Sequence, residues 1–214
     1  MLKAAAAEIW EPAEIQAFVT KRVDTILEER GVPVNKIQPP RLDIAVPALE
    51  AMRYSQLRNE IAALIATSMD TRSSSNVHPS FIEILRQLTG DELAILGAMP
   101  AQESVVAIGH IHEALSQGRT RIVHRNIIPP NLALICQDRA CIPAYIDNLL
   151  RLKLVNVPSG LAISEKGPYE ALLKNDFCRP YFETRRKPKK YRLERSLIAI
   201  TDLGERFRNA CLGR

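Results

Sequence analysis

The chain has 214 residues, of which 46% are hydrophobic and only 5% are aromatic, so aliphatic side chains must fill its core. The net charge of +5 permits an acidic partner without requiring one. No run of about 18 apolar residues exists in the sequence, which excludes a membrane-spanning helix.

The cysteines argue against a zinc site and against a disulfide framework. Cys136, Cys141, Cys178 and Cys211 have no C-x-x-C spacing and no histidine at ligand spacing nearby. We expect free thiols in a cytoplasmic protein, because structural disulfides form mainly in oxidising compartments. The first residues, MLKAAAAEIW, are too short and too rich in alanine for a secretory signal. The sequence predicts neither a metal nor a cofactor.

The first hundred residues have the apolar spacing of α-helices. We expect helices at about 8–30, 41–52, 57–69, 79–88 and 89–99. The second should begin or break at Pro47, since proline removes a helical hydrogen bond. The third and fourth should pack on each other across a loop rich in serine, and Thr89 and Glu92 have the spacing of a capping box.

After Glu103 the apolar period becomes alternating, as in a β-strand. Residues 105–111 alternate, residues 121–128 are rich in β-branched side chains, and residues 116–118 can turn the chain between them. We therefore expect a two-stranded hairpin that ends at Pro129 and Pro130, followed by a short helix at 131–137.

The last third has its own pattern. It predicts a helix at 139–153, a short strand at 154–157, a helix at 169–181, a strand at 196–200 and a closing helix capped by Thr201. This order is typical of a winged helix, with residues 139–153 as recognition helix and 158–196 as an enlarged wing. The predicted fold is mainly α with small β elements. A helical region spans 1–100, and a β-hairpin with a winged-helix-like unit spans 101–214, as two domains or as one continuous domain.

Two parts of the chain resemble the abortive infection alpha family, which is also catalogued as a domain of unknown function. The segment SMDTRSSSNVHPSFIEILRQLTGDELAIL resembles the family's leucine/alanine helix, acidic turn, V-H-P-S-F block and L-[ST]-x-[DE]-E stop. The segments YIDNLLRLKLV and ITDLGERFRNAC resemble its C-terminal helix and closing T-x-x-G-x-x-F pattern.

The resemblance covers residues 10–211 and implies a bacterial protein associated with defence against phage. It supplies no catalytic residues. His78 and Ser80 belong to the V-H-P-S-F block, and we expect them to cap a helix and fix its loop.

Positive charge is concentrated in residues 179–195, where eight basic residues oppose two glutamates. Tyr181, Phe182 and Tyr191 interleave with these cations and could stack on single-stranded bases. The segment could bind phosphates, an acidic protein or an anionic surface, or it could simply be a solvated loop. The candidate nucleic-acid-binding residues are Arg151, Arg185, Arg186, Lys187, Lys189, Lys190 and Arg192. The predicted recognition helix carries few donors, and Asp138 and Asp147 oppose phosphate, which argues against sequence-specific DNA reading.

Two further patterns have weaker support. Arg119 and His124 have the R-x4-H spacing of some abortive-infection ribonucleases, but that motif needs a helix and this run is β-like. His110, His112 and His124 could share one region of the hairpin, yet no acidic residue at fixed spacing supports a metal site. We expect exposed strand histidines.

No nucleotide-binding or hydrolase motif occurs in the sequence. We therefore expect a cytoplasmic bacterial defence protein that binds a partner, protein or nucleic acid, rather than an enzyme. A winged-helix regulator that binds nucleic acid through residues 179–195 and a ribonuclease-type toxin are the alternatives, and homo-oligomerisation is left open.

Overall fold

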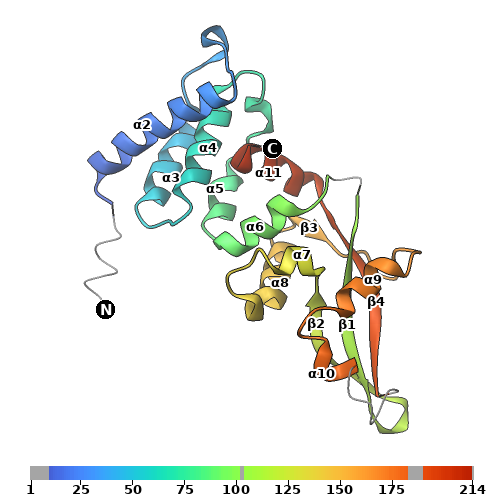
Figure 1. The fold of residues 1–214 in the computed structure, drawn as a ribbon. Helices are drawn as coiled ribbons and strands as arrows, with labels where there is room; N and C mark the ends of the chain where they lie inside the picture. Colours follow the sequence, from blue (N-terminus) through green and yellow to red (C-terminus); the bar gives the residue numbers. More distant parts are fainter. Residues whose placement is uncertain (1–9, 102–103, 183–189, 214) are drawn as a thin grey trace. The chain divides into compact units, whose positions relative to one another are not determined.

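The computed structural model describes residues 10–101, 104–182 and 190–213 (Figure 1). They divide into two compact units. Unit 1 contains residues up to Gly90 together with those from Arg206 onward, and unit 2 is Asp91–Glu205. Helices are the main elements and one small antiparallel sheet accompanies them, which confirms the expected mainly α class. Among the described residues, no helix has the length and apolar character needed to cross a bilayer.

Unit 1 is a group of helices built around a buried central one. Its elements are α2 (Pro12–Glu29), α3 (Leu42–Met52), α4 (Arg58–Met69), α5 (Ser80–Leu85) and the last turns of α11 (Asp202–Leu212). Helix α4 packs against α2, α3 and α5. Its Ile61, Ala62, Leu64 and Ala66 have no exposed surface, so small and branched side chains together make the core of this unit.

Helix α3 continues through Pro47, contrary to the expectation that it would begin or break there. The missing N–H of Pro47 leaves the carbonyl of Asp43 without a helical donor, but Asp43 is exposed and water can reach it. Burial of Ile44, Ala48 and Met52 holds the helix together on either side of the proline.

The V-H-P-S-F block connects the N-terminal helices of unit 1 with the C-terminal helix α11. The backbone N–H of Ser80 donates to Nδ1 of His78 at 3.1 Å, so His78 caps α5 as expected. Phe81 is fully buried and meets Phe207 of α11 edge to face, with ring centroids 5.4 Å apart. The C-terminal helix is therefore part of the core that the N-terminal helices build.

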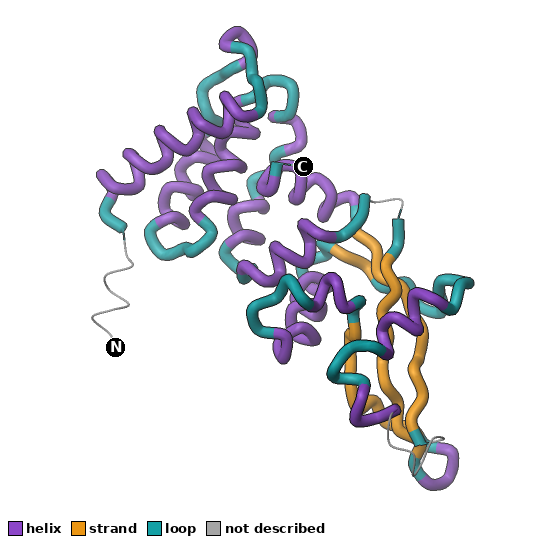
Figure 2. Tube along the Cα trace, viewed as in Figure 1, coloured by secondary structure: helices purple, strands orange, loops and turns teal. Residues whose placement is uncertain are grey.

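Unit 2 is a curled sheet with short helices. It contains most of α6 (Gly90–Ala98), then β1 (Val106–Ala114), β2 (Thr120–Ile127), α7 (Pro130–Ala133), α8 (Ile142–Arg151), β3 (Val155–Asn156), α9 (Gly167–Leu173), α10 (Arg179–Phe182) and β4 (Tyr191–Ile200). The strands, orange in Figure 2, lie in the order β2-β1-β4-β3. Each neighbouring pair is antiparallel. The predicted hairpin is confirmed, with its turn at Ser116–Gly118.

The separate winged-helix unit is not confirmed. Strand β4 starts at Tyr191 and pairs with β1 from Glu113↔Tyr191 to Val106↔Ile198, while β3 contributes only two residues beside Ile200 and Ala199. Residues 191–196, which were expected in a wing, therefore form an inner strand of the same sheet as the hairpin.

The single helix expected at 169–181 is wrong, because the chain breaks into α9 and α10 around Asn175. The N–H of Cys178 donates to the Asn175 carbonyl three residues earlier, which is a turn bond rather than the i→i+4 bond of an α-helix. The side-chain amide of Asn175 donates to the carbonyl of Ile128. Tyr169 and Leu172 of α9 pack on Ala107, Ile111 and Ile127 of the sheet. All four cysteines are free thiols, as predicted.

Candidate nucleic-acid interface

Four cations lie at the end of the sheet where the β1–β2 hairpin turns. The register places Arg121 beside Glu113 and Arg192 beside His112 on the two strands flanking β1. Arg119 precedes β2, and the carbonyl of Lys190 accepts a hydrogen bond from the N–H of Ala114 at 2.7 Å. We call Arg119, Arg121, Lys190 and Arg192 the basic rim.

Glu113 is a buried carboxylate held between two of these cations. Lys190 Nζ lies 2.5 Å from its Oε1, and Arg121 Nε donates to its Oε2 at 2.5 Å. These bonds, from Lys190 first and then Arg121, hold the pKa of Glu113 below its ordinary value. The bond to Glu113 likewise raises the pKa of Lys190. The side chains of Arg121 and Lys190 are still 64% and 38% exposed, so they also present charge to solvent.

The other two cations of the basic rim are not neutralised. Arg119 and Arg192 are exposed, and neither has an ion-pair partner within the part of the chain that the structure describes. The nearby Glu194 is hydrogen-bonded through its Oε2 to Nε2 of His112 and contributes one carboxylate beside Arg192. The four cations of the rim outnumber the two carboxylates beside them, Glu113 and Glu194, so the rim carries a net positive charge that can bind phosphate oxygens.

The aromatic side chains next to the rim contact each other. The rings of Tyr181 and Tyr191 are 5.2 Å apart, edge to face, and Nζ of Lys190 lies 5.4 Å from the centre of the Tyr191 ring. Both tyrosines, with Phe182, pack against the core beneath α9 and are only partly buried. They support the rim, and part of each side chain is accessible from outside.

The structure brings together some of the residues predicted from sequence. Lys190 and Arg192 belong to the basic rim. Arg185, Arg186, Lys187 and Lys189 lie outside the described residues. Arg151 ends α8, where its guanidinium bonds to Oδ1 of Asn148 at 2.7 and 3.0 Å.

Arg151 does not belong to the rim. It shortly precedes β3, which pairs with Ile200 at the opposite end of β4 from Arg192. Arg119 and Arg121, in contrast, were not among the predicted binding residues. Their position directly after a predicted turn was the available signal, but nothing local in the sequence showed that β4 pairs with β1.

The R-x4-H pair lies on a strand. His124 is within β2, Arg119 precedes it, and five residues of strand span about 17 Å. The His124 ring stacks on Phe177 with centroids 5.5 Å apart, and burial lowers its pKa. The arrangement does not place the arginine and the histidine around one phosphate.

The strand histidines are half-buried rather than exposed, which corrects the sequence expectation. Nδ1 of His110 accepts a hydrogen bond from the N–H of Asn126 at 3.1 Å, and burial lowers the pKa of His110. Across the described ranges, no three His, Cys, Asp or Glu side chains are grouped so that they could hold a metal ion. His110 and His112 instead bond to neighbouring strands.

Comparison with known proteins gives one family and one related structure. The family model described as abortive infection alpha matches residues 14–211. No curated protein matches the chain. A solved structure of an uncharacterized protein from the marine bacterium Alcanivorax borkumensis SK2 is 21% identical, with 65% of this chain and 94% of that chain covered and a TM-score of 0.41.

Proposed function

We propose that the chain, a member of the abortive infection alpha family, acts in anti-phage defence. The family description indicates a role related to abortive infection. The proposed mechanism is binding of nucleic acid through the basic rim. The observation that carries this proposal is the uncompensated charge of Arg119 and Arg192. Each guanidinium can donate two parallel hydrogen bonds to a phosphate.

The neighbouring anions strengthen this argument. Glu113 is bonded by Arg121 and Lys190, and Glu194 is hydrogen-bonded to His112, so neither carboxylate forms an ion pair with Arg119 or Arg192 among the described residues. A polyanion at this end of the sheet would therefore meet four cations against two carboxylates, which is a net positive field.

The sequence adds charge at the same point of the chain. Residues 183–189 join α10 to Lys190 and contain Arg185, Arg186, Lys187 and Lys189 against a single Glu183. Lys190 fixes one end of this segment to the basic rim through Glu113. The added charge of these four residues supports binding to several consecutive phosphates of a nucleic-acid strand.

We expect binding without sequence preference, through the backbone. The predicted recognition helix α8 uses its polar side chains within unit 2, since Asn148 donates to Oε1 of Glu92 at 2.6 Å and Asp147 accepts from Asn126 at 2.8 Å. Cations at the end of a sheet, in contrast, suit phosphates, which carry no sequence information.

A fivefold variant tests the proposal. Arg185, Arg186, Lys187, Lys189 and Lys190 are replaced by Gln, and retention of the protein on immobilised single-stranded RNA and duplex DNA is measured at low salt. We expect retention to fall strongly. Each cation that contacts a phosphate releases counterions condensed on the nucleic acid, and the variant loses this favourable contribution to binding. Retention equal to that of the unmodified protein would refute the proposal.

The biological role is tested by phage plaquing. Cells that carry the unmodified protein should give fewer plaques than cells without it, together with loss of the infected cells. The fivefold variant at the same cellular level should lose this protection. Full protection by a variant that no longer retains nucleic acid would show that defence does not depend on nucleic-acid binding, and would contradict the proposed mechanism.

A further inference from the structure

Helix α3 is apolar on its outer side as well as on its inner side. Its inner face buries Ile44, Ala48 and Met52. Leu42, Val46 and Leu49 point outward, with 76%, 53% and 38% of their surface exposed. Their spacing of four and three residues aligns them in one stripe, which we call the apolar stripe. Exposed Asp43 and Glu50 separate this stripe from the buried face, and a contiguous exposed apolar patch is typical of a contact surface.

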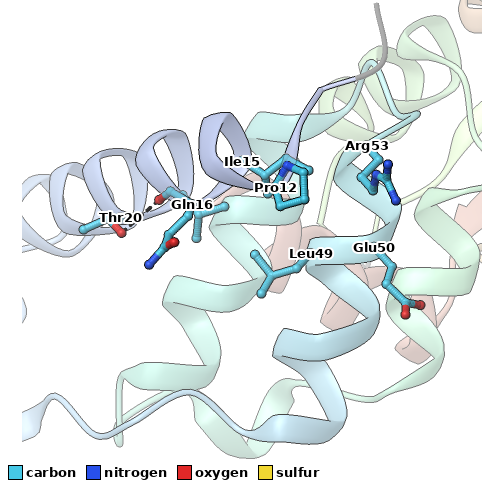
Figure 3. A pocket seen from close by; sticks show the side chains of 8 residues that line it. Pro12, Ile15, Gln16, Thr20, Leu49, Glu50 and Arg53 are labelled. Carbon is cyan, nitrogen blue, oxygen red and sulfur yellow. Dashed lines mark hydrogen bonds between the residues drawn. The ribbon is translucent and has the colours of Figure 1, made fainter.

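A hollow lies beside this stripe. It measures about 470 Å³ and lies between α2 and α3, with Pro12, Ile15, Val19 and Leu49 as its apolar lining (Figure 3). Figure 3 shows Leu49 of α3 facing Pro12 and Ile15 of α2. The hollow is large enough to receive an aliphatic side chain from outside.

A cation that pairs with no carboxylate in the described part of the chain borders the same hollow. Arg53 lines it, and Nε of Arg53 is buried with no hydrogen-bond partner among the described residues. The Arg53 guanidinium lies 5.6 Å from the ring of Tyr54, and no described carboxylate pairs with it. Glu50 lines the hollow as well, so the surface fits an occupant that offers an apolar side chain and places a carboxylate at Arg53 rather than at Glu50.

We propose that the occupant is the α3 helix of a second copy of this chain, packed antiparallel about a twofold axis between Pro47 and Ala48. This pairing sets Val46 of each copy against Leu49 of the other. It also sets Leu42 of each copy against Arg53 of the other, where it enters the hollow. Asp43, which is exposed and paired with Arg41 in its own chain, then comes within a turn of the other copy's Arg53.

The surface is self-complementary, which is why a second copy fits it better than a foreign helix. Each copy supplies a protruding leucine on α3 and a hollow between α2 and α3 that can receive it, together with the cation Arg53 and the carboxylate Asp43. A twofold interface requires such a patch, because each residue contact occurs twice. The inference concerns unit 1 alone and does not depend on nucleic-acid binding.

The test is the mass of the unmodified protein in solution by light scattering, over a range of concentrations. We expect a dimer. Val46→Glu and Leu49→Glu should each raise the dimer dissociation constant by at least about tenfold. Each substitution would bury a carboxylate against the apolar side chain that faces it in the other copy. Val34→Glu is the matched control, because Val34 is 86% exposed in unit 1 and lies outside the stripe. Circular dichroism verifies that each variant is folded.

A charge exchange tests the register. Arg53→Asp and Asp43→Arg should each weaken the dimer, and the double variant should recover it, because the pair is re-formed across the axis. An unmodified protein that is monomeric at every concentration overturns the proposal, as does a dimer that Val46→Glu leaves unchanged. Failure of the double variant to recover the dimer overturns the antiparallel pairing.

Discussion

Glu113 and Lys190 form an ion pair, with 2.5 Å between Oε1 and Nζ, that ties the end of β1 to the start of β4. Glu113 is a buried carboxylate, and basic side chains surround it. The pair explains how strongly basic sequence can enter an ordered strand, since the carboxylate offsets the repulsion between Lys190 and Arg121.

Stability at acid pH should depend on Glu113. Its pKa is lowered in the folded protein, so its contribution is complete above the unfolded pKa of about 4.3 and is lost as pH falls through the folded value. Glu113→Gln should therefore lower Tm at neutral pH and reduce the loss of Tm on acidification. Thermal melts from neutral pH to about pH 3 measure this, with Glu28→Gln on α2 as control. A variant with the same pH dependence as the unmodified protein would contradict it.

The T-x-x-G pattern at the start of α11 has a steric explanation. Oγ1 of Thr201 accepts a hydrogen bond from the N–H of Gly204 at 3.0 Å, and a Cβ on Gly204 would lie 2.0 Å from the carbonyl oxygen of Leu154. We expect Gly204→Ala to lower the free energy of unfolding by about 1–3 kcal/mol, as measured in urea.

Gly90 is the comparison for this substitution, because nothing lies within 4 Å of a Cβ placed there. Gly90→Ala should leave stability unchanged or raise it by up to about 1 kcal/mol, since alanine is the better helix former. Equal effects at Gly204 and Gly90 would show that the close approach to Leu154 is not limiting.

The edge-to-face contact between Phe81 and Phe207 should be a major support of unit 1. Both rings are fully buried, so Phe207→Ala should cost about 3–5 kcal/mol in the free energy of unfolding. A double-mutant cycle with Phe81→Ala should give a coupling of about 0.5–1.5 kcal/mol. Strict additivity of the two losses would show that the rings do not stabilise each other.

His124 tests the ribonuclease alternative. The ring is half-buried against Phe177, and Arg119, which precedes β2 by one residue, lies about 17 Å away along the extended chain, too far to act with it. We expect His124→Gln to leave protection in a plaquing assay unchanged, at a temperature where melting shows the variant to be folded. Loss of protection in a folded variant would revive a catalytic role.

Local patterns predicted the elements of the fold better than their pairing. Alternation at 105–111 and β-branched residues at 121–128 predicted the hairpin, because neighbouring strands leave a period in the sequence. The pairing of β4 with β1 joins distant segments and leaves no such period, so the local pattern of residues 191–196 predicts a wing rather than an inner strand. The break at Asn175 was missed for a similar reason, since its side chain bonds to the distant carbonyl of Ile128.

The candidate interface shows the same limit. Charge density alone placed Lys190 and Arg192 in a basic segment, and the structure adds Arg119 and Arg121 from the hairpin turn through the β2-β1-β4 order. Arg151 is a candidate binding residue only if residues 139–153 act as the recognition helix of a winged helix. In the structure it lies near β3, at the other end of β4 from Arg192.

The most direct test measures the anisotropy of a labelled single-stranded RNA against protein concentration at several salt concentrations. The variant Arg119→Gln with Arg192→Gln removes the two uncompensated cations and leaves the bonds to Glu113 in place. Lys21→Gln with Lys36→Gln removes equal charge from exposed positions of unit 1 and serves as control. We predict weaker binding by the first variant and a salt slope reduced by about 1.4, from about 0.7 per lost phosphate contact, with the control unchanged. Equal affinity and slope in all three proteins would contradict the account.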